Sequence, residues 1–337
     1  MRNGTDPLLE VEGLTIDFDG AVSQPGLVQD VSFTVSRGES VALIGESGCG
    51  KTMTAMAVLG LLPAGFRVAA GRIALGGRDL LTCSARELRA IRGRSIGAIF
   101  QDPMSSLDPT MRVGDQIAEA RRLHLKERRP VALRRARELL DRVGIPNADK
   151  RLASYPHELS GGMQQRVMIA SAIACDPELV LADEPTTALD VTIQAEILEL
   201  LRDLRTEQGI AVLLVTHDLG VVADFCDRVV AMYAGAVVER AGVEDIFGAP
   251  AHPYTRALLD AIPQSGRPRT VLPVIPGRVP PAGSFPTGCR FEPRCDHGGH
   301  DRCRAPQHEA AVADGRYSRC ARVADGDLVL AAGVGAR

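Results

Sequence analysis

The feature that most constrains this chain is the run VALIGESGCGKT, residues 41–52. VALI is a short apolar run without alternation, as expected of a strand buried on both faces. GESGCGKT fits the pattern G-x-x-x-x-G-K-[S/T], and a helical stretch follows it. A strand, a glycine loop and a helix in this order predict a phosphate-binding loop, because inward-turned N–H groups and a helix N-terminus attract an anion.

Each position of this loop has an expected role. The glycines let the backbone wrap the β-phosphate of ATP, Lys51 reaches the β- and γ-phosphates, and Thr52 supplies a hydroxyl to Mg²⁺. Cys49 has no base beside it in the sequence, so we interpret it as a small filler residue and not as a nucleophile. The predicted ATP-binding residues of the loop are Gly45, Glu46, Ser47, Gly48, Cys49, Gly50, Lys51 and Thr52.

Two later stretches place polar groups after apolar strands. LVLADE ends in Asp183, expected to hold Mg²⁺, and Glu184, expected to polarise the attacking water. THD places His217 after another buried strand, at the sheet edge where α/β proteins bind ligands. Acidic turn residues and structural histidines are common, but the phosphate loop favours the catalytic interpretation here.

The surrounding pattern indicates an α/β fold. Residues 8–37 alternate as strands of a sheet with one buried face, and residues 115–150 are helical and rich in arginine. Strand-like runs return at 178–185 and 210–218 with a helix between them, as in a parallel sheet, and DRVVAMYAGAVVERAG is typical of a hairpin. Beyond about residue 250, Pro and Gly indicate a poorly helical linker.

Composition excludes some functions. The formal charge of −3 gives no global argument for nucleic-acid binding. No run approaches the roughly 18 apolar residues of a membrane-spanning helix, and no signal peptide is visible, so we expect a soluble chain in reducing cytosol. In that compartment its eight cysteines would be metal ligands or free thiols more often than disulfides.

Together with LSGGMQQR (159–166), these motifs make the chain resemble an ABC-type ATPase from residue 8 to about 245. The resemblance implies a P-loop NTPase fold: a RecA-like parallel-sheet core, an N-terminal antiparallel β subdomain and a helical subdomain at about 102–158. It implies a nucleotide-binding domain over 1–250 and an irregular, Cys-rich C-terminal extension over 251–337. Two such domains meet head to tail in this family.

The resemblance also assigns site residues. Ser160, Gly161, Gly162 and Gln164 would face the ATP of a partner subunit. Gln101 in FQDP is similar to the glutamine that links the Mg²⁺ site to the transmembrane partner, and Asp190 in TALD to a subunit-contact aspartate. Phe18 is the candidate for stacking on adenine, with a half-buried strand phenylalanine as the alternative.

Within the family, IFQDPMSSLDP and HPYTRALLDAIP (252–263) resemble the ATP-binding subunits of bacterial peptide importers, of the D-type. This implies ATP hydrolysis at the cytoplasmic face of the inner membrane, powering uptake of di- or oligopeptides. The implied partners are a second, non-identical ATPase, two transmembrane permeases and an extracytoplasmic solute-binding protein. Nickel, glutathione and other small solutes remain alternatives. A soluble ABC ATPase acting on DNA or ribosomes is a less favoured alternative, because the 109 positions between Lys51 and Ser160 leave no room for the long coiled coil that such proteins often insert.

The tail contains the spacing C-x5-C-x7-C-x16-C, formed by Cys289, Cys295, Cys303 and Cys320. Spacing alone leaves zinc and an iron–sulfur cluster comparable. Peptide-importer ATPases carry a similar GCxFxPRC tail that can hold a [4Fe–4S] cluster, which favours that cofactor. Zinc, with His297, His300 or His308 substituting for a thiol, and free thiols are the alternatives. A metal would crosslink a segment without an obvious core.

The arginines of the helical insert allow two interpretations. They could favour an anionic membrane surface, but acidic neighbours dilute the charge, so a solvated helix face is preferred. The arginines in question are Arg121, Arg122, Arg128, Arg129, Arg134, Arg135 and Arg137.

Overall fold

The computed structural model describes residues 7–18, 26–187, 190–262 and 273–330. Contacts divide the chain into two compact units. The first consists of Met1–Leu8, Val35–Glu39 and Thr82–Leu214. The second consists of Leu9–Thr34, Ser40–Leu81 and Val215–Arg337.

The first unit contains three strands in the order β8-β7-β6. β6 (Ile96–Ile99) and β7 (Leu179–Asp183) are parallel, with Ile99 opposite Ala182. Every residue of β7 and of β8 (Ala211–Val215) is buried, as their unbroken apolar runs predict. The parallel register places the carboxyl ends of β6 and β7 at one edge of this sheet.

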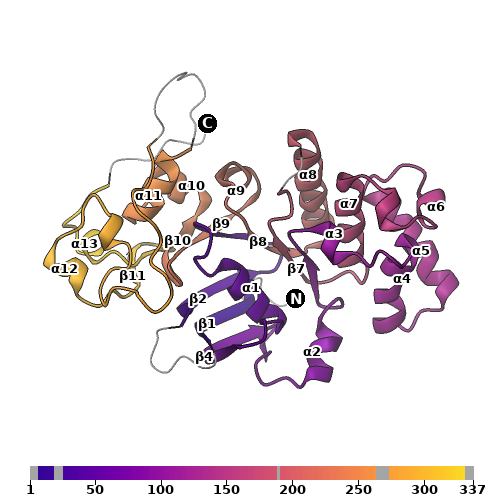
Figure 1. Ribbon diagram of the computed structural model, residues 1–337, viewed down its shortest axis with the longest axis horizontal. Coiled ribbons are helices and arrows are strands. Elements are labelled where there is room, and N and C mark those ends of the chain that lie inside the picture. Colours follow the sequence, from indigo (N-terminus) through magenta and orange to yellow (C-terminus); the bar gives the residue numbers. More distant parts are fainter. Residues whose placement is uncertain (1–6, 19–25, 188–189, 263–272, 331–337) are drawn as a thin grey trace. The chain divides into compact units, whose positions relative to one another are not determined.

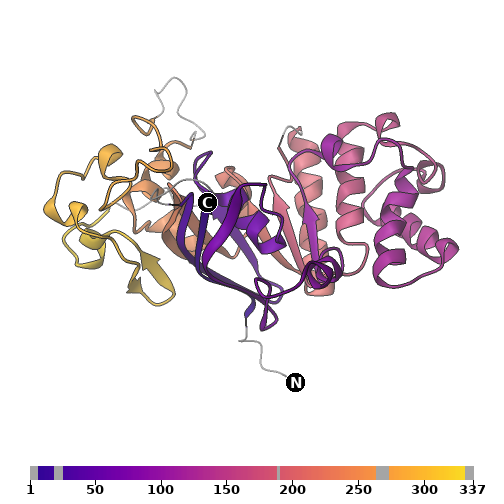
Figure 2. The ribbon, with the colours of Figure 1, turned by 60° about the horizontal axis from the view of Figure 1, so that its bottom comes forward.

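Helices make up most of the rest of the first unit (Figures 1 and 2). The buried positions Ala132, Ala136 and Leu140 recur at a helical spacing on one face of α5 and pack towards α4. The helical elements of this unit are α2 (Ala85–Ile91), α3 (Pro103–Ser106), α4 (Val113–His124), α5 (Arg129–Arg142), α6 (Ala148–Arg151), η1 (Pro156–Glu158), α7 (Gly161–Ala172) and α8 (Val191–Gln208). The helices predicted at about residues 115–150 are thus confirmed, as α4, α5 and α6.

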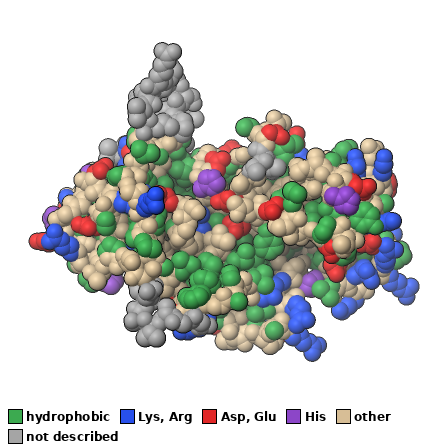
Figure 3. Space-filling view, in the orientation of Figure 1, with side chains coloured by type: hydrophobic (Ala, Val, Ile, Leu, Met, Phe, Trp, Pro, Cys, Tyr) green, Lys and Arg blue, Asp and Glu red, His purple; other side chains and the backbone are tan. Residues whose placement is uncertain are grey.

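Basic side chains gather over α4–α6, with carboxylates among them (Figure 3). Arg121 is buried and donates to Glu127 at 2.7 Å and 2.9 Å. Arg129, Arg135 and Arg137 pair with exposed or half-buried carboxylates of the same helical region. These pairs support the solvated-face interpretation, because they neutralise charge that a membrane surface would need.

The second unit contains an antiparallel sheet in the order β2-β1-β4-β5. Burial alternates along β2, as the sequence predicted for a sheet with one buried face. β1 pairs with β4 in antiparallel register, from Leu9 opposite Leu75 to Phe18 opposite Phe66. The strands are β1 (Pro7–Phe18), β2 (Val28–Ser36), β4 (Phe66–Leu75) and β5 (Arg78–Asp79).

Five further strands of this unit follow the order β11-β12-β10-β9-β3. β3, the last strand in this order, is parallel to β9, and β9 forms the expected hairpin with β10. The strands are β3 (Ser40–Ile44), β9 (Arg228–Tyr233), β10 (Ala236–Gly242), β11 (Ala310–Ala313) and β12 (Arg316–Ser318). The helical elements are α1 (Lys51–Leu59), α9 (Leu219–Phe225), α10 (Val243–Gly248), α11 (Pro253–Asp260), η2 (Glu292–Arg294), α12 (Asp301–Arg304) and α13 (Ala321–Ala324).

The segment after residue 250 differs from its sequence interpretation. It was expected to lack obvious helices and strands, but α11 occupies PYTRALLD, and β12 pairs with β10 in antiparallel register (Figure 1). The short strands escaped notice because four alternating residues carry little periodic signal. The expected boundary near residue 250 does not coincide with a boundary of the compact units.

A buried polar junction joins the extension to β10. Glu239 is 1% exposed, lies opposite Ser318 of β12, and accepts a hydrogen bond from the backbone N–H of Ala251 at 2.6 Å. Ser318 Oγ donates to the carbonyl of Ala251 at 2.7 Å. Burial raises the pKa of Glu239 to about 7 and lowers that of the fully buried His252 to about 3. Between about pH 3 and about pH 7, the side chains of Glu239 and His252 are therefore both neutral.

No helix in the described part of the chain is long and apolar enough to cross a membrane.

We expect Glu239→Gln to flatten the dependence of stability on pH. The pKa of this carboxyl is 4.5 in the unfolded chain and about 7 when folded, so the wild type loses stability as pH rises through this window. The loss is on the order of 2 kcal/mol relative to the variant, which cannot ionise there. Urea unfolding of both proteins from pH 5 to 8 measures it, and parallel curves would contradict the assignment. The charge of Arg316 lowers the pKa of Glu239. Because Arg316 is present in both proteins, it does not account for a difference between their curves.

Candidate functional site

The phosphate loop occupies residues 45–50, between β3 and α1 of the second unit. Gly45 and Gly50 have φ of +145° and +101°, which L side chains rarely adopt. A Cβ on Gly45 would lie 2.2 Å from the carbonyl oxygen of Met232 in β9, so the loop can lie against β9 only with glycine there. The sequence pattern thus folds into the turn that the motif predicts.

Lys51 is positioned across the loop by backbone carbonyls. It is 6% exposed, and its Nζ donates to the carbonyl oxygens of Gly45 at 2.7 Å and Glu46 at 3.1 Å. Ser47, Gly48 and Thr52 are exposed beside it. Exposed amides and hydroxyls around one held ammonium group form the arrangement that a polyphosphate requires.

Cys49 is fully buried inside the loop, and burial raises the pKa of its thiol. A thiol that resists ionisation is a poor nucleophile, which agrees with its interpretation as a filler residue.

His217 lies at the same sheet edge as the phosphate loop. The preceding Thr216 donates its backbone N–H to the carbonyl of Leu43 in β3 at 3.2 Å. His217 is exposed, and Asp218 after it caps α9 by accepting hydrogen bonds from the backbone N–H groups of Gly220 and Val221. The strand end therefore presents the imidazole to solvent, where a nucleotide can approach.

Phe18, the last residue of β1, is 54% exposed. Its ring packs edge-on against Phe66 with centroids 5.1 Å apart and lies close to Gly65. The ring is thus about half exposed, which is compatible both with stacking on adenine and with a half-buried strand phenylalanine. Its role with adenine stays a prediction.

In the first unit, Gln101 contacts Glu184 at the carboxyl edge of β6 and β7. Asp183 ends β7 and is 4% exposed. Glu184 follows with φ of +47°, a left-handed conformation that costs energy and commonly marks a functional position. Gln101 Nε2 donates to Glu184 Oε2 at 2.9 Å, and Thr187 Oγ1 donates to the same oxygen at 3.0 Å. These two donors orient the carboxylate.

The LSGGMQQR stretch opens α7. Ser160 is the N-cap, and its Oγ accepts a hydrogen bond from the backbone N–H of Met163 at 3.4 Å. Gly161 is exposed, with no atom within 4 Å of the position a Cβ would take. The start of this twelve-residue helix is thus open to a close approach by an anion.

Two residues expected to act between subunits also have tasks inside this chain. Gln164 is buried, and its Nε2 donates to the carbonyls of Pro156 and Leu159, which holds the loop before α7. Asp190 is exposed and caps α8 by accepting from the backbone N–H of Ile193 at 2.9 Å. Their intersubunit roles stay predictions.

The four tail cysteines converge on one small cavity, although they come from separate parts of the extension. It is lined by Cys289, Cys295, Cys303 and Cys320, all of which are free thiols. Burial, together with the neighbouring thiols, raises the pKa of Cys289 to about 12 and that of Cys295 to about 11. Without a cation Cys289 and Cys295 therefore stay protonated at neutral pH.

This donor set fits a four-thiolate cluster. Within the described residues, however, no group of three or more His, Cys, Asp or Glu side chains could hold a metal ion, so the cofactor stays a prediction.

Sequence reasoning missed two residues that contact the phosphate loop. Tyr254 is fully buried, and its hydroxyl accepts the backbone N–H of Glu46 at 2.8 Å. Arg294 forms an ion pair with the Glu46 side chain at 2.7 Å. Both lie in motifs that were noticed, HPY and PRC, but their distance of more than 200 positions from the loop gave no signal of contact.

Comparison with known families agrees with this geometry. Residues 28–187 match the ABC transporter family, and residues 238–303 match the family described as oligopeptide/dipeptide transporter, C-terminal region. The second match contains α11 and three of the four tail cysteines.

Individual relatives extend over nearly the whole chain. The dipeptide transport ATP-binding protein DppD of Escherichia coli is 46% identical, over 93% of this chain and 96% of its own length. A Brucella abortus protein whose name describes a peptide import ATP-binding protein is 48% identical, over 94% and 95% respectively.

Solved structures share the fold. CbiO1 of Clostridium perfringens, part of an ABC transporter complex, is 28% identical with a TM-score of 0.61, covering 72% of this chain and 91% of its own. A dimeric bacterial ABC transporter cassette has the same identity and TM-score, covering 70% and 98%. The family matches and the relatives that span nearly the whole chain agree with the geometry of the site. The chain therefore belongs to the ABC transporter family, in the group that carries the oligopeptide/dipeptide transporter C-terminal region.

Proposed function

We propose that this chain is an ATP-hydrolysing subunit of a membrane importer for di- or oligopeptides. The observation that carries the proposal is the pairing, in one chain, of a match to the ABC transporter family with a match to the C-terminal region named for oligopeptide/dipeptide transporters. The names of the relatives, which describe dipeptide transport and peptide import, support peptides over nickel or glutathione.

The chemistry follows from the residues that the two units present. Lys51 and the exposed amides of the loop bind the β- and γ-phosphates of ATP. Glu184, oriented by Gln101 and Thr187, accepts a hydrogen bond from the attacking water and polarises it. His217, exposed at the loop's sheet edge, contacts the γ-phosphate.

By the pattern of the family, Thr52, Asp183 and Gln101 would supply oxygen ligands to Mg²⁺, the donors that this ion prefers. When bound, it neutralises charge on the transferred phosphoryl group.

Assembly follows from the open start of α7. Ser160, Gly161 and Gly162 would bind the γ-phosphate held by a second ATPase subunit, and Asp190 would contact that subunit. Hydrolysis then lets the ATP-bound pair reopen. The helical region α3–α6 would receive two transmembrane permeases, which places this chain at the cytoplasmic face of the membrane. An extracytoplasmic binding protein would deliver the peptide.

Affinity purification of the tagged chain from its own cells in mild detergent tests the assembly. We expect two multispanning proteins and a second, non-identical ATPase, identified by mass spectrometry. Co-purification with ribosomes or DNA-binding proteins and no membrane protein would overturn the importer proposal in favour of a soluble ATPase.

We expect Glu184→Gln to reduce steady ATP turnover by about 100-fold or more, because the amide cannot polarise water as the carboxylate does. Nucleotide binding should persist, since Lys51 and the phosphate loop are unchanged. Phosphate release by the assembled complex and binding of a fluorescent ATP analogue measure the two properties. Glu199→Gln, the same change at an exposed position of α8, is the matched control. Turnover equal to the wild type in Glu184→Gln would refute the role.

We further propose a [4Fe–4S] cluster on Cys289, Cys295, Cys303 and Cys320. The convergence of four thiols on one cavity supports it. Zinc is the alternative, because four thiolates can also hold Zn²⁺ in a tetrahedral site with Zn–S bonds of about 2.3 Å. The cluster would crosslink the loops of the extension.

Anaerobic purification followed by iron, sulfide and zinc analysis tests the cluster. We expect about four irons per chain with broad absorbance near 400 nm, both lost in Cys295→Ser. Cys83→Ser, a cysteine of the first unit, is the control and should keep the iron. A colourless, zinc-loaded protein would refute the cluster.

A further inference from the structure

The extension binds an acidic residue inside the phosphate loop. Arg294 donates from Nη1 to Glu46 Oε2 at 2.7 Å and from Nη2 to Glu46 Oε1 at 3.0 Å, a bidentate pair. The Arg294 side chain is 5% exposed and that of Glu46 is 29% exposed, so water screens the pair weakly. A bidentate guanidinium–carboxylate pair fixes direction as well as distance.

Arg294 is itself fixed by other contacts. Its Nε donates to the carbonyl of Pro276 at 2.7 Å, and Nη2 donates to that of Ile275 at 3.3 Å. Nη1 also donates to the hydroxyl of Tyr233 at 3.3 Å. All three nitrogens of the guanidinium therefore have partners, and Glu46 is the only carboxylate among the partners described.

The backbone of Glu46 is held by the same region. Its N–H donates to the hydroxyl of Tyr254, whose ring packs against Tyr233 and Phe291 with centroids 4.7 Å and 5.3 Å apart. Phe291 lies between Cys289 and Cys295 and is 2% exposed. The backbone of Glu46 is thus fixed by Tyr254 of α11, and its side chain is fixed by Arg294, which lies between Cys289 and Cys295.

The cysteine site lies next to these contacts in the chain. Arg294 directly precedes Cys295 and ends η2, whose first residue donates its N–H to the carbonyl of Cys289. Cys289 N–H in turn donates to the carbonyl of Cys303 at 2.7 Å. The path that the chain takes between the thiols therefore determines where the guanidinium lies.

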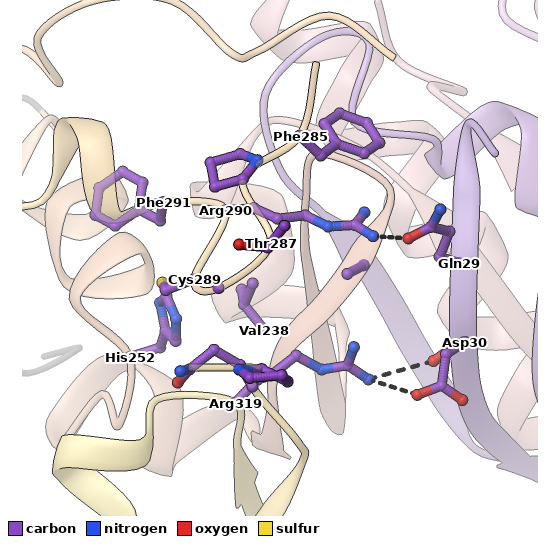
Figure 4. Close-up of a pocket in the computed structure, with 15 residues that line it drawn as sticks. Gln29, Asp30, Val238, His252, Phe285, Thr287, Cys289, Arg290, Phe291 and Arg319 are labelled. Atoms are coloured by element: carbon purple, nitrogen blue, oxygen red, sulfur yellow. Dashed lines mark hydrogen bonds and ion pairs between the residues drawn. The ribbon is translucent and has the colours of Figure 1, made fainter. Parts of the chain in front are cut away.

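Two more arginines beside tail cysteines contact the cassette, around a cavity of about 370 Å³. Arg290, which follows Cys289, bonds Gln29 and the carbonyl of Ala234, and Arg319, which precedes Cys320, pairs with Asp30 at 3.1 Å (Figure 4). Of the three arginines, Arg294 alone reaches a side chain of the phosphate loop among the contacts described.

We propose that Arg294 is a positioning residue for ATP binding, and that through it the state of the tail cysteines controls nucleotide affinity. An unpaired carboxylate at Glu46 would repel a polyphosphate and release the loop from its fixed conformation. Arg294 neutralises that charge and holds the loop in place. The inference rests on the proposed function only in requiring that the chain bind ATP.

The first test measures the dissociation constant of a fluorescent ATP analogue for the full chain. Arg294→Gln should raise it about tenfold, because one partner of a nearly buried pair is lost. Adding Glu46→Gln to that variant should recover most of the affinity, since the uncompensated charge is removed. In the assembled complex, KM for ATP should rise while kcat at saturating ATP stays within about twofold, as expected for a residue that acts on binding alone.

Arg319→Gln is the matched control. Arg319 also belongs to the extension, but it pairs with Asp30, whose side chain is 70% exposed and lies outside the phosphate loop. Its dissociation constant should stay within about twofold of the wild type. Equal losses in both arginine variants would reduce Arg294 to a docking contact and overturn the proposal, as would unchanged affinity in Arg294→Gln. A wild-type chain that binds no nucleotide would instead refute the proposed function.

The second test uses the reciprocity of coupled sites. If the cysteine site controls nucleotide affinity, saturating Mg-ATP should slow alkylation of the four tail cysteines by iodoacetamide several-fold in the wild-type chain from which bound metal has been removed. The effect should disappear in Arg294→Gln. Peptide mass spectrometry reports each thiol, with Cys83 as the internal control. Alkylation rates that are the same with and without Mg-ATP in the wild type would overturn the proposed coupling between the cysteine site and nucleotide binding.

Discussion

The close approach of the phosphate loop to the β9–β10 hairpin is the constraint on which the second unit depends. Gly45 leaves no room for a side chain against the carbonyl of Met232, and Gly235 N–H donates to the carbonyl of Cys49 at 3.0 Å. The two-residue hairpin turn places Ala234 and Gly235 at positive φ, as a primed turn requires. A loop supported in this way keeps its amides oriented without a ligand. The same hairpin, through β10, also carries the extension.

Much of the cassette could be predicted from its sequence because its signals are local. VALI, the glycine loop and Lys51 are contiguous, so the sequence motif alone predicts the strand, the loop and the helix that follow one another. Asp183 and Glu184 follow an apolar run, and the parallel register of β6 and β7 then places Gln101 beside Glu184. The hydrogen bond itself was not predictable, because the register of two strands about 80 positions apart leaves no trace in a single sequence.

The extension was harder to predict for a physical reason. Its strands are three or four residues long, and its order depends on contacts with β10 and on the convergence of four thiols. Pro and Gly there suggested a linker, although Tyr254 and Phe291 contribute to a fully buried aromatic cluster. HPY and PRC were visible as family motifs, yet their contacts with Glu46 join positions more than 200 residues apart.

An acidic residue in an anion-binding loop needs an explanation of its own. Glu46 weakens phosphate binding by its charge unless a cation lies against it. Among the contacts described, the loop's own cation, Lys51, reaches the carbonyl of Glu46 but not its carboxylate. The compensating charge comes from a segment more than 200 positions later that depends on a thiol site for its path. A glutamine at this position would remove the need for compensation altogether. Retaining the carboxylate makes the loop's electrostatics conditional on the extension being in place, so a chain with a disordered tail would bind ATP poorly and would not consume it wastefully.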